Sequence, residues 1–295
     1  MYESGFSGFW AARELNELGI KCMVTHAADV PSSQKERLNK NDKVDAGKLA
    51  RSLSQNNLKP IYIPERLAEE YRYLSRYRDS VIKDQTRIKN RIKASLHFFG
   101  ITIPIELQGD RRWSGAFIQW LKSQKFESEY GQFAYDSLID ELIEKRKRLS
   151  KILKEMRKMA KNAKPLNIII PLLLTVTGVG FITAMTFATE IMDMRRFKRL
   201  ESLANYIGLV PSVESTDDKV KVLGVSNRRN KHLRKMLIEA AWIAVRKDPA
   251  LTMKYNNLTK RMHGNKAIVR ITKILVNRMR HVWNTQQPYV MGIVA

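Results

Sequence analysis

The chain has 295 residues, and its 53 lysines and arginines against 29 aspartates and glutamates give a formal net charge of +24. With 44% hydrophobic residues the composition excludes a disordered or fibrous protein and allows about two or three folded domains. A single cysteine excludes a disulfide framework and a cysteine-rich zinc site. The large positive charge indicates a polyanionic partner, for which nucleic acid is the first candidate and acidic lipid the second.

The first 65 residues predict a small α/β domain. The segment FWAARELNELG has the pattern of an amphipathic helix, and the apolar IKCMVT that follows it is typical of a short strand. A second helix is expected to begin near Asp42 or Asp45, and IYI, between Pro60 and Pro64, is a further strand candidate.

Residues 66–164 are predicted to form two long helices. Apolar residues alternate at spacings of four and three from Leu67 to Phe99, and again from Tyr135 to Met159. This heptad pattern is typical of coiled-coil helices. The two helices could pair with each other as a hairpin, or each could pair with another copy of the chain.

Residues 165–189 carry no charged side chain and are long enough to span a bilayer. Because Pro171, Gly178 and Gly180 interrupt them, we expect a buried helix–turn–helix and no membrane helix. The turn at Gly178 and Gly180 resembles a helix-hairpin-helix, whose backbone N–H groups bind a phosphate. The alternative is a plain turn between two packed helices.

Basic residues concentrate on the two long helices and in the last third of the chain. Runs of this kind are usually solvated helix faces, but here they have one sign and few acidic partners at helical spacing, which favours phosphate binding. The candidate nucleic-acid contacts are Arg87, Lys89, Arg91, Lys93, Gly178, Gly180, Arg228, Arg229, Lys231 and Arg234.

Three carboxylates are candidates for a metal site. Asp42 and Asp45 are three residues apart at a helix start, which places them on one face, and Glu3 precedes a turn into the first helix. Clustered carboxylates suit Mg²⁺ in phosphoryl transfer. Equally, Asp42 could cap the helix and Asp45 could be a surface charge.

The polar insertion that begins PSVESTDDKVKVLGVSNRR is expected to be irregular. A hydroxyl of Ser212, Ser215 or Thr216, surrounded by cations, could attack a phosphodiester. The alternative is a hydrophilic surface loop in which the serines stabilise turns.

Several blocks of this sequence, in this order, resemble transposases of the IS110/IS1111 type over nearly the whole chain. They are YESGFSGFWAARELNELGIKCMVTHAADVP, KNDKVDAGKLARSL, TVTGVGFITAMTFATEI, YIGLVPSVEST, LGVSNRRNKHLRKMLIEAAWIAVRKDPAL and GNKAIVRITKILVNRMRHV. The resemblance implies a RuvC-like, RNase H-type α/β domain over 1–65, coiled-coil helices over 66–164 and a mainly helical transposase domain over 165–295.

The resemblance further implies a DNA transposase or recombinase that works through a covalent serine–DNA intermediate. Glu3, Asp42 and Asp45 match the glutamate and the last two aspartates of the family's DEDD set, which holds Mg²⁺. The expected partners are DNA, a structured guide RNA and further copies of the chain, as a dimer or tetramer, with no membrane and a cytoplasmic location.

Two features depart from the family pattern. The family's first aspartate precedes its glutamate by several elements, whereas this chain begins two residues before Glu3, so we expect a shortened form whose α/β sheet lacks its initial strands. The family usually has Ser-Gly or Ser-Ser-Gly after the GLxP proline, where this chain has Ser215, Thr216 and Asp217. Ser215 is favoured as the nucleophile over Thr216. The alternatives are a catalytically inactive relic that still binds DNA or RNA, and a resolvase-type nuclease that needs no serine.

Overall fold

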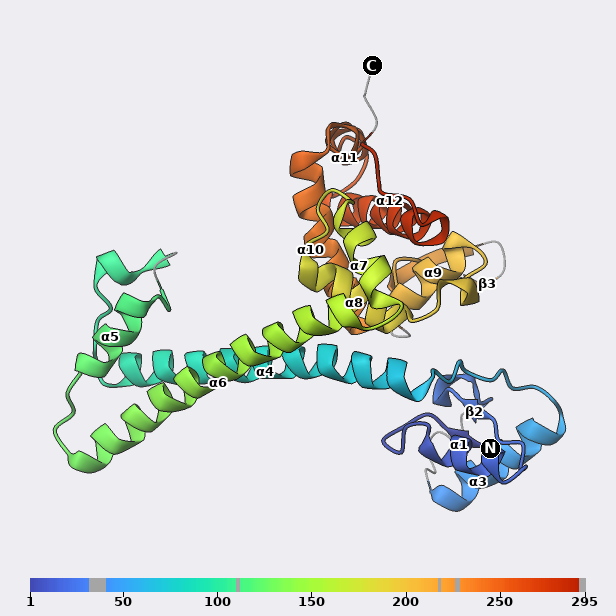
Figure 1. Cartoon of the computed structure of the whole chain (residues 1–295), viewed down its shortest axis with the longest axis horizontal. Coiled ribbons are helices and arrows are strands. Elements are labelled where there is room, and N and C mark those ends of the chain that lie inside the picture. The colour runs from blue at the N-terminus through green and yellow to red at the C-terminus, as the bar shows by residue number, and fades with distance from the viewer. Residues whose placement is uncertain (32–40, 110–111, 217–218, 226–228, 292–295) are drawn as a thin grey trace. The chain divides into compact units, whose positions relative to one another are not determined.

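The computed structural model describes residues 1–31, 41–109, 112–216, 219–225 and 229–291, with residues 211–216 and 219–225 described by their backbone alone. The chain divides into two compact units, Met1–Arg66 and Leu67–Ala295. Each unit is described by itself (Figure 1).

The first unit is a small α/β body. Strands β1 (Tyr2–Glu3) and β2 (Val24–Thr25) pair in parallel, with Glu3 opposite Thr25, and helix α1 (Trp10–Glu17) connects them. The segment around Ile61 lies beside β2, since the Ile61 amide donates to the Val24 carbonyl (2.9 Å). The 3₁₀ helix η1 (Ala27–Asp29) and helix α3 (Asp42–Ser54) complete the unit. The RNase H-type fold expected for this part stays a prediction.

The second unit begins with two long helices, α4 (Arg66–Phe98) and α6 (Glu129–Asn162). Between them lie the 3₁₀ helix η2 (Ile105–Leu107) and helix α5 (Gly115–Ser123). Ile88 and Ile92 of α4 share a core with Ile139 and Leu142 of α6, and Figure 1 shows the two helices crossing. Of the two arrangements left open by the heptad spacing, the structure therefore contains the intramolecular hairpin. The supercoiling of this pair stays a prediction.

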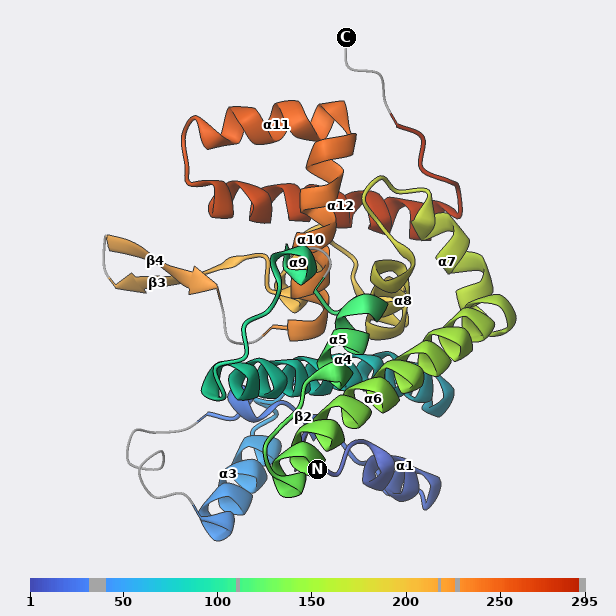
Figure 2. The same cartoon turned by 90° about the vertical axis from the view of Figure 1, so that its left-hand side faces the viewer.

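The rest of the second unit is mainly helical, as expected. It contains α7 (Leu166–Leu174), α8 (Phe181–Ile191), the 3₁₀ helix η4 (Met194–Arg196), α9 (Leu200–Ile207), α10 (Lys231–Lys247), α11 (Pro249–Thr259) and α12 (Gly264–Thr285). Leu237 and Ala241 of α10 and Ile271, Leu275 and Met279 of α12 are fully buried in one core, because their spacing of four residues forms an apolar stripe on each helix. Figure 2 shows α10 and α12 crossing.

The uncharged segment 165–189 forms two short helices, α7 and α8, with a turn between them, as the helix–turn–helix interpretation predicts. Within the described ranges, none of the helices combines the length and the apolar character that crossing a bilayer requires.

The polar insertion after α9 is a regular hairpin, so the expectation of an irregular segment was wrong. Strands β3 (Pro211–Thr216) and β4 (Lys219–Val225) pair antiparallel, with an irregularity between Pro211 and Val213. The signal was present in the sequence KVKVLGV, where β-branched valines alternate with other residues at the period of a strand.

Candidate catalytic and nucleic-acid site

The two aspartates of the expected metal site lie in the first turn of α3. Asn41 caps this helix, its Oδ1 accepting from the Val44 amide (2.8 Å), so Asp42 is the first helical residue and not the cap. Asp45 accepts a hydrogen bond from Nζ of the buried Lys48 (2.9 Å). One of the two carboxylates is therefore already neutralised by a cation of its own helix.

Glu3 lies at the end of β1, on a different element from both aspartates. In the part of the chain that the structure describes, no three histidine, cysteine, aspartate or glutamate side chains are close enough together to hold a metal ion. Mg²⁺ requires a compact, near-octahedral set of oxygen ligands. Glu3, Asp42 and Asp45 as placed here do not provide that set, and their catalytic role stays a prediction.

The candidate nucleophiles lie at the far end of β3. Ser215 is opposite Val220 and Thr216 is opposite Lys219 in the hairpin register, whereas Ser212 lies at the irregular start of the strand. Successive positions of a strand belong to opposite faces. Ser215 and Thr216 are therefore on different faces of the hairpin, and a DNA strand bound to one face would meet one of the two positions.

The two ends of this hairpin meet at what we call the root, namely Gly208 before β3 and Arg229–Asn230 after β4. Gly208 ends α9 with a left-handed φ of 85°, and a Cβ atom there would overlap Cβ of Arg229. Nη1 of Arg234 donates to the Gly208 carbonyl, and the Asn230 amide donates to the Tyr206 carbonyl (3.1 Å). Both strands thus leave the helical body from one place.

Cations surround this root, as the sequence predicts for residues of this segment. Arg229 and Lys231 are exposed and Arg234 is half-buried, while Arg228 lies outside the described residues. Burial lowers the pKa of Arg234, and the charge of Arg229 lowers it further. Two arginines therefore lie close enough to repel each other, an arrangement that a bound phosphate would relieve.

A buried polar group beside the root was not anticipated from the sequence. We call Arg76, Glu190, Tyr206 and Asn230 the Glu190 cluster. Glu190 is fully buried, and its carboxylate accepts from Nε (2.6 Å) and Nη2 (2.8 Å) of Arg76 on α4 and from Nδ2 of Asn230 (2.8 Å). The Tyr206 hydroxyl donates to the Glu190 carbonyl (3.3 Å). The cluster therefore joins α4, α8, α9 and the start of α10.

The charges in the Glu190 cluster are mutually dependent. Burial alone would raise the pKa of Glu190, but the hydrogen bond and charge of Arg76, together with the Asn230 amide, hold that pKa below its ordinary value. The same hydrogen bond raises the pKa of Arg76. Since 114 residues separate this pair, spacing could not reveal it, although Glu190 is the one charged residue in FITAMTFATEI.

A second contact joins α4 to the start of α10, one turn further along α4. Nδ1 of His232 is 2.8 Å from Oδ2 of Asp79, and Arg78 Nη1 is 3.0 Å from the other oxygen of that carboxylate. Burial would raise the pKa of Asp79, but the bond to His232 and the charge of Arg78 lower it overall. Arg76 thus holds α4 against Glu190 of α8, and Asp79 holds it against the start of α10.

The two glycines of the α7–α8 turn have different surroundings. Gly178 has a φ of 90°, and a Cβ atom there would be 2.7 Å from the Ala240 carbonyl oxygen and from Cβ of Ala244. Gly180 is exposed as the N-cap of α8, with nothing near its Cβ position and no side-chain cap. Gly178 thus permits packing against α10, and the amides that follow Gly180 are the part of this turn suited to a phosphate. That binding stays a prediction.

The four basic residues expected to bind nucleic acid on α4 do not share one face. At about 100° per residue, Arg87 and Arg91 lie on the same side of α4 as Lys83, whereas Lys89 and the exposed Lys93 lie roughly on the opposite side. Arg87 forms an ion pair with Asp84, and Nζ of Lys89 is 5.4 Å from the centre of the Trp113 ring. Burial lowers the pKa of Lys89, with a smaller effect from Arg146.

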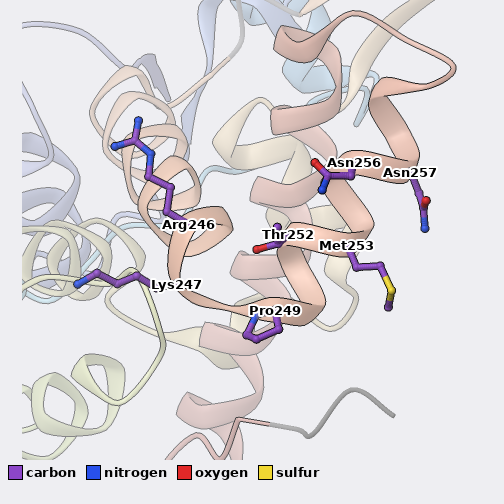
Figure 3. Close-up of a pocket in the computed structure, with 7 residues that line it drawn as sticks. All are labelled: Arg246, Lys247, Pro249, Thr252, Met253, Asn256 and Asn257. Carbon is purple, nitrogen blue, oxygen red and sulfur yellow. The ribbon is translucent and has the colours of Figure 1, made fainter.

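A shallow cavity of about 490 Å³ lies where α10 meets α11. Figure 3 shows the labelled side chains around it, which are Arg246, Lys247, Pro249, Thr252, Met253, Asn256 and Asn257. This lining contains two cations and two amides but no carboxylate or histidine. It is compatible with a contact to an anion and has no group that could act as a general base.

Comparisons with known proteins match two separate ranges of the chain, in the order that the resemblance implies. The family model described as "Transposase IS116/IS110/IS902 family" matches residues 170–256, and the model of IS110-type DEDD transposases matches residues 3–100. The first of these ranges contains the hairpin, α10 and all of the Glu190 cluster but Arg76. The second contains Glu3, Asp42, Asp45 and α4.

Similar curated proteins are described as transposases. The chain is 29% identical over 241 residues to the transposase y4qE of Sinorhizobium fredii, an alignment that covers 82% of this chain and 57% of that protein. It is 26% identical to the transposase of element IS1111A of Coxiella burnetii, over 69% of this chain and 54% of that protein. The corresponding values for the transposase of IS1328 of Yersinia enterocolitica are 26%, 81% and 68%. The chain thus spans little more than half the length of the first two.

Proposed function

Since the chain belongs to the IS116/IS110/IS902 family of transposases, we propose that it acts on DNA as the transposase of an insertion element, with Ser215 as nucleophile. One observation carries this proposal: a regular hairpin presents Ser215 and Thr216 at its far end, and the root of that hairpin is surrounded by arginines and a lysine. A hydroxyl that is held away from the helical body, on a hairpin whose root offers cations to neighbouring phosphates of a bound strand, suits attack on a phosphodiester.

The proposed reaction is a transesterification. The Ser215 Oγ loses its proton and forms a bond to phosphorus, while the bond from phosphorus to one deoxyribose oxygen breaks and leaves a free DNA hydroxyl. That hydroxyl, or one from a second DNA strand, later attacks the serine–phosphate bond and releases Ser215. Arg229, Lys231 and Arg234 lie at the root, at the other end of β3 from Ser215, and would bind neighbouring phosphates of the same DNA.

The inclusion of magnesium in the proposal rests on the family model, because the positions of the carboxylates do not support it. The DEDD family model suggests divalent-metal dependence in general, but Glu3, Asp42 and Asp45 do not converge on one point in the described residues. No step of the reaction is therefore derived through the metal. DNA, a structured guide RNA and further copies of the chain as a dimer or tetramer are the proposed partners, supported by the net charge of +24 and by the family.

The test is the formation of a covalent protein–DNA adduct. The full chain is incubated with radiolabelled DNA that carries the ends of the element, and the label that stays with the protein on a denaturing gel is measured. We expect Ser215→Ala to abolish the adduct and Thr216→Ala to retain it. Ser212→Ala, on the same strand but at its other end, is the matched control and should also retain it.

A nucleic-acid-binding protein without catalytic activity is the second candidate, favoured by the separation of the three carboxylates. It predicts tight, salt-sensitive binding of DNA or RNA and no adduct with any variant. A resolvase-type nuclease would instead cut DNA in the Ser215→Ala/Thr216→Ala double variant. An adduct that persists in this double variant would contradict the proposed nucleophile.

A further inference from the structure

The Glu190 cluster lies where the serine hairpin joins the helical body. Asn230 lies at the root, five residues after the last residue of β4, and its side chain has two roles. Its Oδ1 accepts from the Leu233 amide (3.1 Å) and so caps α10, while its Nδ2 donates to Glu190 (2.8 Å). The point at which the chain enters α10 is therefore held by a bond to Glu190.

The other end of the root depends on the same group of residues. Tyr206, two residues before Gly208, accepts the Asn230 amide on its carbonyl and donates its hydroxyl to the Glu190 carbonyl. Gly208 packs on Arg229, and its carbonyl is bound by Arg234. Tyr206, before β3, and Asn230, before α10, are thus both tied to Glu190, while Arg229 and Arg234 hold Gly208 beside them.

Glu190 in turn is held by α4, which lies outside the residues 170–256 that match the transposase family model. Arg76 binds both carboxylate oxygens of Glu190, a planar two-point contact that fixes direction as well as distance. A buried charge that loses its partner is strongly destabilised. The position of α4 and the position of the hairpin root are therefore coupled through one carboxylate.

We propose that Glu190 is a positioning residue for the serine hairpin, linking the placement of Ser215 to helix α4 through Arg76 and Asn230. This inference rests on the proposed nucleophilic role of Ser215. Glu190 itself does not contact DNA in this scheme. Its effect is to fix the angle at which β3 and β4 leave the body, so that the far end of the hairpin is presented in one orientation.

The test is hydrogen exchange of backbone amides in the full chain, without DNA. Glu190→Gln removes the charge that Arg76 requires while keeping the size of the side chain. We expect amides of β3, β4 and the first turn of α10 to exchange about tenfold faster, with α12 amides unchanged. Asn230→Ser is the second variant, because serine still caps α10 but is too short to reach Glu190. It should accelerate the same amides.

Asp248→Asn is the matched control. Asp248 is also fully buried and paired with an arginine, Arg278, but it lies at the opposite end of α10, where it caps α11. It should accelerate exchange at the start of α11 and leave the hairpin unchanged. The proposal is overturned if hairpin amides are unaffected in both Glu190→Gln and Asn230→Ser, or if they respond equally to Asp248→Asn.

A failure of this inference is distinguishable from a failure of the proposed function. Hydrogen exchange reports on the hairpin whether or not the chain reacts with DNA, and the adduct experiment reports on the nucleophile whatever holds the hairpin. If the exchange prediction is met and no adduct forms with any DNA, the proposed reaction fails and the coupling of Glu190 to the hairpin stands.

Discussion

Gly178 lies so close to Ala244 that a Cβ atom built on the glycine would be 2.7 Å from the alanine's own Cβ. The same atom would be 2.7 Å from the Ala240 carbonyl oxygen, which belongs to the backbone of α10 and cannot rotate away. The turn between α7 and α8 therefore approaches α10 at a distance that only glycine permits. Its left-handed φ of 90° adds a second reason for glycine at this position.

We expect Gly178→Ala to destabilise the chain by roughly 2–4 kcal/mol. The new methyl group must push α10 away, and alanine must adopt a left-handed backbone conformation that it disfavours. The control is Gly180→Ala, two residues along the same turn, where the Cβ position is open and φ is negative. That change should cost under about 1 kcal/mol, as for the loss of a modest N-cap. Urea unfolding followed by circular dichroism measures both, and equal losses would contradict the packing role of Gly178.

The acid stability of the chain should depend on Glu190. Its pKa is lower when folded than when unfolded, so at acid pH the unfolded state binds more protons and stability falls as pH decreases through that range. We expect the unfolding free energy of the parent chain to decrease below about pH 5, and that of Glu190→Gln to start lower and to decrease less steeply. Tyr206→Phe removes a neighbour of Glu190 without removing a carboxylate, so it should keep the steep dependence. Urea unfolding at a series of pH values decides between these outcomes.

Nucleic-acid binding through α4 should involve its solvent face and not the whole helix. Substituting both Arg87 and Arg91 by glutamine should reduce the slope of log affinity against log salt by about 1–2, since each lost phosphate contact contributes about 0.9. Lys89→Gln should leave the slope unchanged, because that ammonium lies over the Trp113 ring. Fluorescence anisotropy with labelled duplex DNA at several salt concentrations measures each slope. A larger effect for Lys89 than for the two arginines would show that the other face of α4 is the one that binds.

The placement of the carboxylates predicts weak metal binding by this chain. Calorimetric titration with MgCl₂ should give a dissociation constant of roughly a millimolar or weaker, because Asp45 is held by Lys48 and Glu3 lies on another element. Lys48→Met frees the Asp45 carboxylate and should strengthen binding, and Asp45→Asn in that background should reverse the gain. Tight binding by the unaltered chain would show that the three carboxylates meet in solution.

Much of the secondary structure could be predicted from the sequence because it depends on residues close together in the chain. The four-and-three spacing around Ile88 and Ile92 indicated a long helix with one apolar face, and that face is the buried one. The break at Gly178 and Gly180 correctly indicated two short buried helices. The hairpin of β3 and β4 was missed because the polar, charged side chains of PSVESTDDKVK suggested a loop. The alternation of valines in β4 does indicate a strand.

The sequence by itself determined the family, the order of the parts and the positions of the candidate nucleophiles, since these depend on which residue types stand at which spacing. Only the tertiary structure decided that Gly178 contacts α10, that Lys89 lies over the Trp113 ring, and that Glu190 joins α4 to the hairpin root. Each of these depends on the approach of segments far apart in the chain. Arg76 and Glu190 are separated by 114 residues, and nothing in their local spacing encodes that they will meet. Burial strongly favours the pairing, because a buried charge that loses its partner costs about 3–5 kcal/mol.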